Sequence, residues 1–214
     1  MIFRVWRLSR LAGAAGLAGL IVLAGCNPLV ELPGQGQPPD FYRLSPPGKD
    51  NGQSTVARAR VVLVETPSVP GDLAGSDIAV RAADNRINFI DSARWTDRTP
   101  DLLRRYLVSA LRRAGPIKGI DGREDIDIQA DYRLRIDVER FYAELDDSPR
   151  VDIRLTATLL RNGPVVLLAD RVFSAERAAD SKRAGAIVDA FDGAMDRITT
   201  DLEAWLTDEM APAP

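Results

Sequence analysis

Alternation of apolar and polar residues is clearest between residues 130 and 178, where it predicts three antiparallel strands. Residues 132–139 and 151–159 both alternate strictly, and residues 165–175 form a third apolar-rich segment. Residues 146–149 read Asp-Asp-Ser-Pro, and Asn162-Gly163 is the residue pair preferred in short hairpin turns. Strands with this alternation have one buried and one solvated face. In the first strand the apolar positions are Tyr132, Leu134, Ile136 and Val138.

Two further segments have the three- and four-residue spacing of amphipathic helices. The first begins near Thr99 and Pro100, which are favoured at the N-cap and the first helical position, and ends before Gly115. The second covers residues 181–208. The first helix has Leu102, Leu103, Tyr106, Leu107, Ala110 and Leu111 on its apolar side and Arg104, Arg105, Arg112 and Arg113 off it. The second has Ile187, Phe191, Met195, Ile198, Leu202 and Trp205 on its apolar side and Asp189, Asp192, Asp196, Arg197, Asp201 and Glu203 on the other. Because Asp192 is on the polar side, the substitution Asp192→Lys is expected to spare folding.

Three shorter strands complete the predicted domain. Residues 57–64 are rich in Val, and residues 76–81 and 86–90 flank a turn at Ala83-Asp84-Asn85. Strands and helices in this order predict an α+β fold, a two-layer domain in which a mostly antiparallel sheet carries two helices packed on one face.

The first 25 residues have the pattern of a lipoprotein signal peptide. Arg4, Arg7 and Arg10 precede fourteen uncharged residues, which are too few to span a membrane alone. Leu23-Ala24-Gly25-Cys26 then resembles a lipobox, in which the thiol of Cys26 receives the lipid. The alternative is a chance cysteine in an ordinary signal or a short anchor. Cys26 is the one cysteine of the chain, so it cannot form an intrachain disulfide. A free thiol is unusual in a secreted domain, and lipidation would account for it.

Composition divides the rest of the chain into a tether and one domain. Residues 26–57 are rich in Pro and Gly and form the lipidated N-terminus and tether, with a short strand at residues 40–44. Residues 58–210 form the domain. Loss of the three signal arginines leaves 25 basic and 31 acidic residues, a net charge of −6. A domain of that charge is a poor partner for nucleic acid.

The sequence offers no constellation of catalytic or metal-binding residues. Histidine is absent, which removes the commonest general base and His-based zinc sites. Ser181-Lys182 fits a helix cap and a solvated lysine better than a catalytic dyad. The acidic run Asp121, Glu124, Asp125 and Asp127 lacks the spacing of a calcium loop and is expected to be a solvated loop. We therefore expect no cofactor, no metal site and no enzymatic activity.

The order of several soft motifs resembles the ABC-type transport auxiliary lipoprotein family. A lipobox is followed by Tyr42-Arg43-Leu44, then by Arg94-Trp95 before a Leu-rich helix, and then by a strand containing Asp131, Tyr132, Leu134, Ile136, Glu139 and Phe141. The resemblance implies a non-catalytic outer-membrane lipoprotein of an intermembrane lipid transport system. It implies as partners an MCE-domain periplasmic protein and its inner-membrane permease and ATPase, with a homo-oligomer left open.

Two other functions compete with this interpretation. One is a structural or assembly-chaperone lipoprotein for another outer-membrane complex, and the other is an envelope enzyme, against which the missing histidine argues. Asn27 follows the lipidated cysteine, whereas Asp is the residue that most often retains lipoproteins at the inner membrane. This favours an outer-membrane location on the periplasmic face.

Overall fold

The centre of the fold is an antiparallel meander of three long strands. The structure, a computed structural model, describes residues 38–46, 59–113, 117–123 and 128–211. Strands β6 (Tyr132–Glu144), β7 (Arg150–Arg161) and β8 (Val166–Ala178) pair in sequence order along nearly their full lengths. Gly163 has φ of +118° in the turn between β7 and β8, a conformation that L side chains rarely adopt. The predicted meander and hairpin are confirmed.

Five shorter strands extend the sheet from the other edge of β6. Both β2 (Arg60–Val64) and β3 (Asp77–Arg81) run parallel to β6, and each pairs with a different end of it. Ser68 bridges the interval between them, because its N–H donates to the Ile136 carbonyl at 2.9 Å and its carbonyl accepts from the Val138 N–H at 2.9 Å. Beyond β2 lies β5 (Ile117–Asp121), and beyond β3 lie β4 (Ile87–Trp95) and β1 (Asp40–Tyr42).

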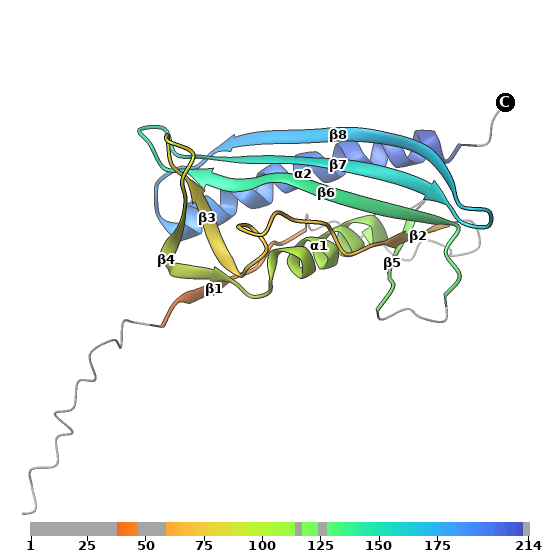
Figure 1. Cartoon of the computed structure of the whole chain (residues 1–214), viewed down its shortest axis with the longest axis horizontal. Helices are drawn as coiled ribbons and strands as arrows, with labels where there is room; N and C mark the ends of the chain where they lie inside the picture. Colours follow the sequence, from red (N-terminus) through yellow and green to blue (C-terminus); the bar gives the residue numbers. More distant parts are fainter. Residues whose placement is uncertain (1–37, 47–58, 114–116, 124–127, 212–214) are drawn as a thin grey trace, which may run out of the picture. The chain divides into compact units, whose positions relative to one another are not determined.

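The eight strands therefore form one mixed sheet that forks at β6 (Figure 1). The long strands and the β3–β4 hairpin are antiparallel, as predicted. Residue Asn85, with φ of 62°, lies in the turn of that hairpin, where the sequence places one. The pairings of β1 with β4, β2 with β5 and β6, and β3 with β6 are parallel. The predicted α+β class is confirmed.

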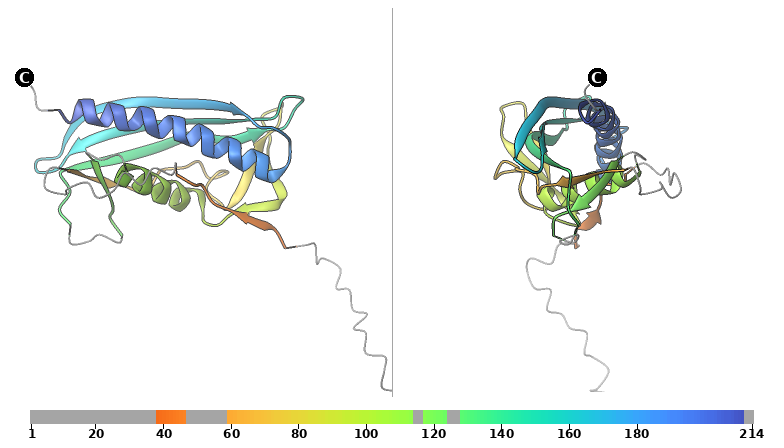
Figure 2. Two further views of the ribbon diagram at one scale, coloured as in Figure 1. Left: turned by 180° about the vertical axis from the view of Figure 1, so that it is seen from behind. Right: turned by 90° about the vertical axis from the view of Figure 1, so that its right-hand side faces the viewer.

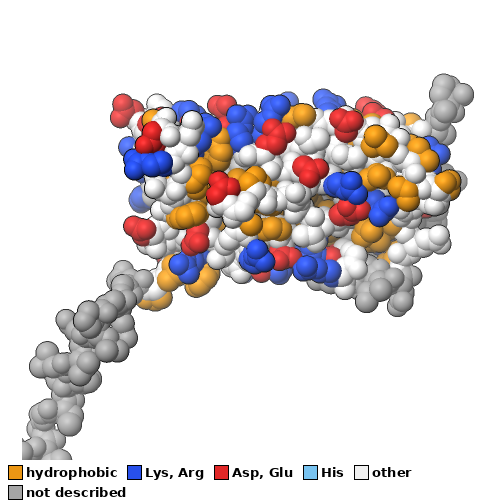
Figure 3. Space-filling view, in the orientation of Figure 1, with side chains coloured by type: hydrophobic (Ala, Val, Ile, Leu, Met, Phe, Trp, Pro, Cys, Tyr) orange, Lys and Arg blue, Asp and Glu red, His pale blue; other side chains and the backbone are white. Residues whose placement is uncertain are grey.

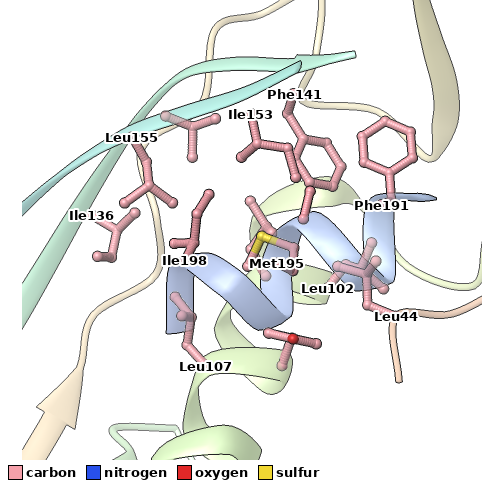
Figure 4. Packing of buried hydrophobic residues seen from close by; sticks show 14 of the residues in the cluster. Leu44, Leu102, Leu107, Ile136, Phe141, Ile153, Leu155, Phe191, Met195 and Ile198 are labelled. Carbon is pink, nitrogen blue, oxygen red and sulfur yellow. The ribbon is translucent and has the colours of Figure 1, made fainter. Parts of the chain in front are cut away.

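The two helices, α1 (Thr99–Arg113) and α2 (Ala184–Glu209), pack on one face of this sheet and against each other (Figure 2). Side chains from both helices and from β6 and β7 point into one cluster (Figure 4). Within it, the rings of Trp95, Phe141 and Phe191 pack together, with centroids 4.7–5.9 Å apart. Within the described residues, no helix is long and apolar enough to cross a membrane.

Residues 38–46, here called the N-terminal segment, belong to the domain although composition places them in the tether. The compact unit begins at Pro38, upstream of the boundary expected at residue 58. β1 pairs with β4, and the Thr96 N–H donates to the Tyr42 carbonyl at 2.7 Å. Leu44 is 6% exposed and joins the hydrophobic core. The segment is therefore an integral edge of the fold.

The structure corrects the sequence expectations around α1 and β5. Strand β5 was not predicted, and Asp121 at its end is buried instead of lying in a solvated loop. Arg104, expected on the solvated side of α1, is 5% exposed and forms an ion pair with Asp121. Thr99, expected as the N-cap, is the first residue of α1, and its hydroxyl donates to the Gly75 carbonyl at 3.0 Å. These contacts join residues that are distant in the sequence, so periodicity alone does not reveal them.

Candidate docking surface

Strand β8 is the longest free margin of the sheet. Among the described strands it pairs with β7 alone, and it forms the upper margin in Figure 1. Nine of its thirteen residues are exposed. Two other strands at margins of the sheet are much shorter, since β1 has three residues and β5 has five. A long margin exposes unpaired N–H and C=O groups, which makes β8 the strongest candidate for contact with another chain.

Side chains of opposite sign occupy the two faces of β8. Phe173 points toward α2, where its ring lies 5.7 Å from that of Trp205. Arg171 and Arg177 share this face, and the Arg177 guanidinium lies against Gly193 of α2, where any Cβ would overlap it. The opposite face carries Asp170, Val172, Ser174 and Glu176. Figure 3 shows side chains of both signs along this upper margin.

The charges of β8 are largely free of ion pairs. Among the described residues, Asp170, Arg171 and Arg177 make no salt bridge, and Glu176 lies 4.0 Å from Arg150. The guanidinium of Arg171 lies 5.3 Å from the Phe173 ring centroid, a cation–π distance. These side chains can therefore pair with charges brought by another molecule.

The neighbouring strands differ, because their outward-facing charges neutralise one another. Glu65 lies 3.2 Å from Arg135 and 3.4 Å from Arg133. Arg154 donates to Glu139 at 2.8 Å. Exposed pairs of this kind contribute little to stability, but they leave few unsatisfied charges for a partner. Within the described residues, Asp170, Arg171 and Arg177 of β8 make no such pair.

A second charged region lies between the β3–β4 and β6–β7 hairpins, beside a cavity of about 460 Å³. Glu144 is buried and pairs with Arg81 and Arg150. Asp152 is also buried and lies 3.3 Å from Arg140. Burial raises the pKa of the Asp152 carboxyl, and Arg140 partly offsets this. Because its acids and guanidinium groups pair with one another, this region serves to hold the two hairpins together.

The seam between α1 and α2 contains a third polar group. The Tyr106 hydroxyl donates to Asp196 Oδ1 at 2.8 Å, and burial together with this hydrogen bond raises the tyrosine pKa. Beside it, Asp192 Oδ1 accepts the Ser45 N–H at 2.9 Å. Burial raises the pKa of the Asp192 carboxyl to about 6. This seam anchors the N-terminal segment to both helices.

Comparison with known proteins places the chain in a family. Residues 42–203 match the family model described as ABC-type transport auxiliary lipoprotein component. The chain belongs to this family. The match spans α1, every strand from β2 to β8, most of α2 and residues 42–46 of the N-terminal segment. The resemblance inferred from the motifs is confirmed.

Solved structures share the fold of this auxiliary lipoprotein domain. Protein XCC0632 from Xanthomonas campestris, assigned to the DUF330 family, is 25% identical and superimposes with a TM-score of 0.67, over 79% of this chain and 96% of its own. A second crystal structure, of an uncharacterized protein, is 18% identical with a TM-score of 0.62, over 79% of this chain and 99% of its own. That second likeness shows the fold alone.

A curated relative matches a smaller part of the chain. Protein bll6063 of Bradyrhizobium diazoefficiens is 34% identical over 112 residues, which are 52% of this chain and 30% of that protein. The match therefore spans less than a third of the relative's length.

The residues singled out from the sequence are not brought together into a reactive site. Cys26 lies outside the described residues. Ser181 does not cap α2, since the N-cap residue is Arg183. The Arg183 N–H donates to the Ser181 hydroxyl at 3.4 Å, and Lys182 is exposed. Of the acidic run, Asp121 is buried and residues 124–127 lie outside the described residues. Within the described ranges, no group of three or more His, Cys, Asp or Glu side chains could hold a metal.

Proposed function

We propose that this auxiliary lipoprotein is a non-catalytic docking subunit of an intermembrane lipid transport system. Its partners in this proposal are an MCE-domain periplasmic protein and the associated inner-membrane permease and ATPase. The observation that carries the proposal is the family match over residues 42–203, together with the free margin of β8. A domain with a long, unpaired strand edge is suited to binding another chain.

We further propose that Cys26 anchors the domain to the periplasmic face of the outer membrane. The support is the signal-like segment before Cys26 and Asn27 after it. Several acyl chains on one residue hold a protein at a bilayer far more firmly than one chain does. From Cys26 to Pro38 the chain has twelve steps, which reach at most about 40 Å when extended. In this arrangement the domain works close to the membrane.

The side chains of the domain support binding over bond-making. The chain has no histidine, and its one cysteine is assigned to lipid. The buried carboxylates Glu144 and Asp152 form ion pairs with arginines. These pairs hold neighbouring strands together and leave neither carboxylate free for a reaction. In this proposal the ATPase of the system supplies the energy, and the lipoprotein supplies a fixed attachment point.

Affinity purification of the full-length, tagged lipoprotein from detergent-solubilised envelope tests this function. We expect quantitative mass spectrometry to recover an MCE-domain protein and its permease, absent from an untagged control. Recovery of an unrelated outer-membrane complex in their place would favour the assembly-chaperone alternative. Turnover of a lipid or ester by the purified protein, abolished by a polar substitution that leaves it folded, would contradict the non-catalytic role.

A further inference from the structure

The two faces of β8 define the chemistry of a chain that could pair with it. We propose that β8 binds, by antiparallel strand addition, an extended segment of the MCE-domain partner. This rests on the proposed function for the identity of the partner. The bound segment would present basic residues on the face away from α2 and acidic residues on the face toward α2.

The backbone of β8 favours strand addition. Natural margins are shielded by prolines, charged side chains or short length; β8 has thirteen residues without proline, and its shielding charges are the four that a partner would have to match. Its one register shift lies near the start of the strand, between Leu159 and Leu160 of β7. The regular part, residues 169–178, is long enough to pair with an eight-residue segment. Main-chain hydrogen bonds would supply the affinity there.

The side chains of β8 supply the specificity. On the face away from α2, Asp170 and Glu176 flank the apolar Val172, which is 44% exposed. On the other face, Arg171 and Arg177 flank the buried Phe173. Side chains directly opposite each other across a strand pair lie on the same face and interact. The complementary segment therefore carries a basic residue at each end of one face, an acidic residue at each end of the other, and apolar residues between.

A second copy of this chain does not meet that requirement. When two β8 strands pair antiparallel in one continuous sheet, residues of one face meet only residues of the same face. Asp170 and Glu176 would then meet each other or neutral residues, and Arg171 and Arg177 would do the same. Antiparallel self-pairing thus leaves every charge unmatched, whereas a partner of the stated pattern neutralises all four.

The direct test uses two peptides of identical composition and the purified full-length protein. In the antiparallel register, the peptide EKVTVVEK places Lys opposite Asp170 and Glu176 and Glu opposite Arg171 and Arg177. The control EEVTVVKK matches two of the four charges in either orientation. We expect fluorescence anisotropy to show at least fivefold tighter binding of the first peptide. Equal affinities, or binding of neither peptide, would overturn the strand-addition proposal.

Charge reversal on β8 supplies the second measurement. The variant Asp170→Lys/Glu176→Lys should lose the preference for EKVTVVEK. Its control is Asp189→Lys/Asp208→Lys, which makes the same charge change at exposed positions of α2 and should retain it. Circular dichroism checks that both variants are folded. If the β8 variant keeps the preference, or if it abolishes self-association of the wild type in sedimentation experiments, the proposed occupant is wrong.

Copurification separates this inference from the function on which it rests. We expect Asp170→Lys/Glu176→Lys to reduce recovery of the MCE-domain protein at least tenfold, and the α2 control to leave it unchanged. Undiminished recovery with the β8 variant would overturn docking at β8 while the proposed function stands. If the wild type recovers no MCE-domain protein, the proposed function and the assigned partner fail, and the peptide experiment alone decides on strand addition.

Discussion

The Ser45 N–H donates a 2.9 Å hydrogen bond to Asp192 Oδ1 across 147 residues of sequence. This contact ties the N-terminal segment to the C-terminal helix next to the buried Leu44. The Pro46 carbonyl accepts a second bond from Arg113 of α1 at 2.9 Å. These two bonds therefore hold the end of the N-terminal segment against both helices.

Asp192 should make stability depend on pH. Burial raises its pKa from 3.8 to about 6, with Asp196 and Asp189 acting in the same direction. A raised folded-state pKa contributes stability that is fully present below about pH 4 and is lost as pH rises through about 6. Asp192→Asn keeps an oxygen acceptor for Ser45 and removes the charge. Because the partly exposed site is screened, we expect about 1 kcal/mol, or about 2–4 °C in Tm, in favour of the variant at pH 8 and no difference at pH 4.

Asp192→Ala and Asp192→Lys are the matched comparisons. Both remove the acceptor for the Ser45 N–H, and Lys also places an ammonium group in a partly buried site. The expectation from sequence that Asp192→Lys spares folding is therefore reversed: we expect a loss of about 1–3 kcal/mol at neutral pH. Chemical denaturation measures the free energy of unfolding of each variant. An unchanged value for the Lys variant would show that the Ser45–Asp192 hydrogen bond does not contribute to stability.

Arg104→Met should destabilise the domain strongly. Arg104 is 5% exposed and pairs with buried Asp121, which joins α1 to β5. Removing one partner of a buried pair typically costs about 3–5 kcal/mol. Arg105→Met is the control, since its side chain is 56% exposed and pairs with Asp97 at the surface. Urea denaturation of both variants checks the difference, and similar midpoints would contradict the structural role of Arg104.

Ile136→Asp should prevent folding. Ile136 is fully buried in the core between the sheet and the helices. An unpaired carboxylate there costs several kcal/mol, comparable to the whole stability of a domain. Arg135→Asn, on the opposite face of the same strand, changes a half-exposed side chain and should cost about 1 kcal/mol or less. Circular dichroism separates the outcomes, because only Ile136→Asp should lose the folded spectrum.

Cys26→Ala should abolish lipidation. The variant is expected to be uncleaved or soluble and to lose palmitate labelling, because no thiol remains to accept the lipid. Metabolic labelling followed by fractionation measures both effects. A variant that still labels and sediments with membranes would rule out the lipobox interpretation.

Asn27→Asp should change where the lipoprotein resides. The wild type is expected in outer-membrane fractions of a density gradient, and Asp after the lipidated cysteine should shift it toward inner-membrane fractions. Wild-type protein found with inner-membrane markers would refute the sorting prediction.

Local pattern was sufficient for most elements of this domain. The strict alternation of β6 and β7, the Asn162-Gly163 turn and the apolar stripe of α2 identify their elements because each signal lies within one contiguous stretch. The order of the same motifs also indicated the family, which the match over residues 42–203 confirms. Neighbouring strands joined by short turns pair with each other, so the meander followed from the sequence as well.

Contacts between distant residues were decided only by the tertiary structure. Parallel pairing of β2 and β3 with β6 joins residues more than 60 positions apart, and no local alternation encodes such a register. In the sequence Arg104 and Asp121 look like solvated charges, and only the packing of β5 against α1 shows that they form a buried pair. Residues 38–46 also look like a tether, and only the fold shows that Leu44 belongs to the core. Likewise, β8 reads as an ordinary strand in sequence. It becomes a docking candidate because, in the described fold, no strand covers its outer side. Periodicity reports which side of an element is apolar, whereas burial and pairing depend on what the rest of the chain places beside it.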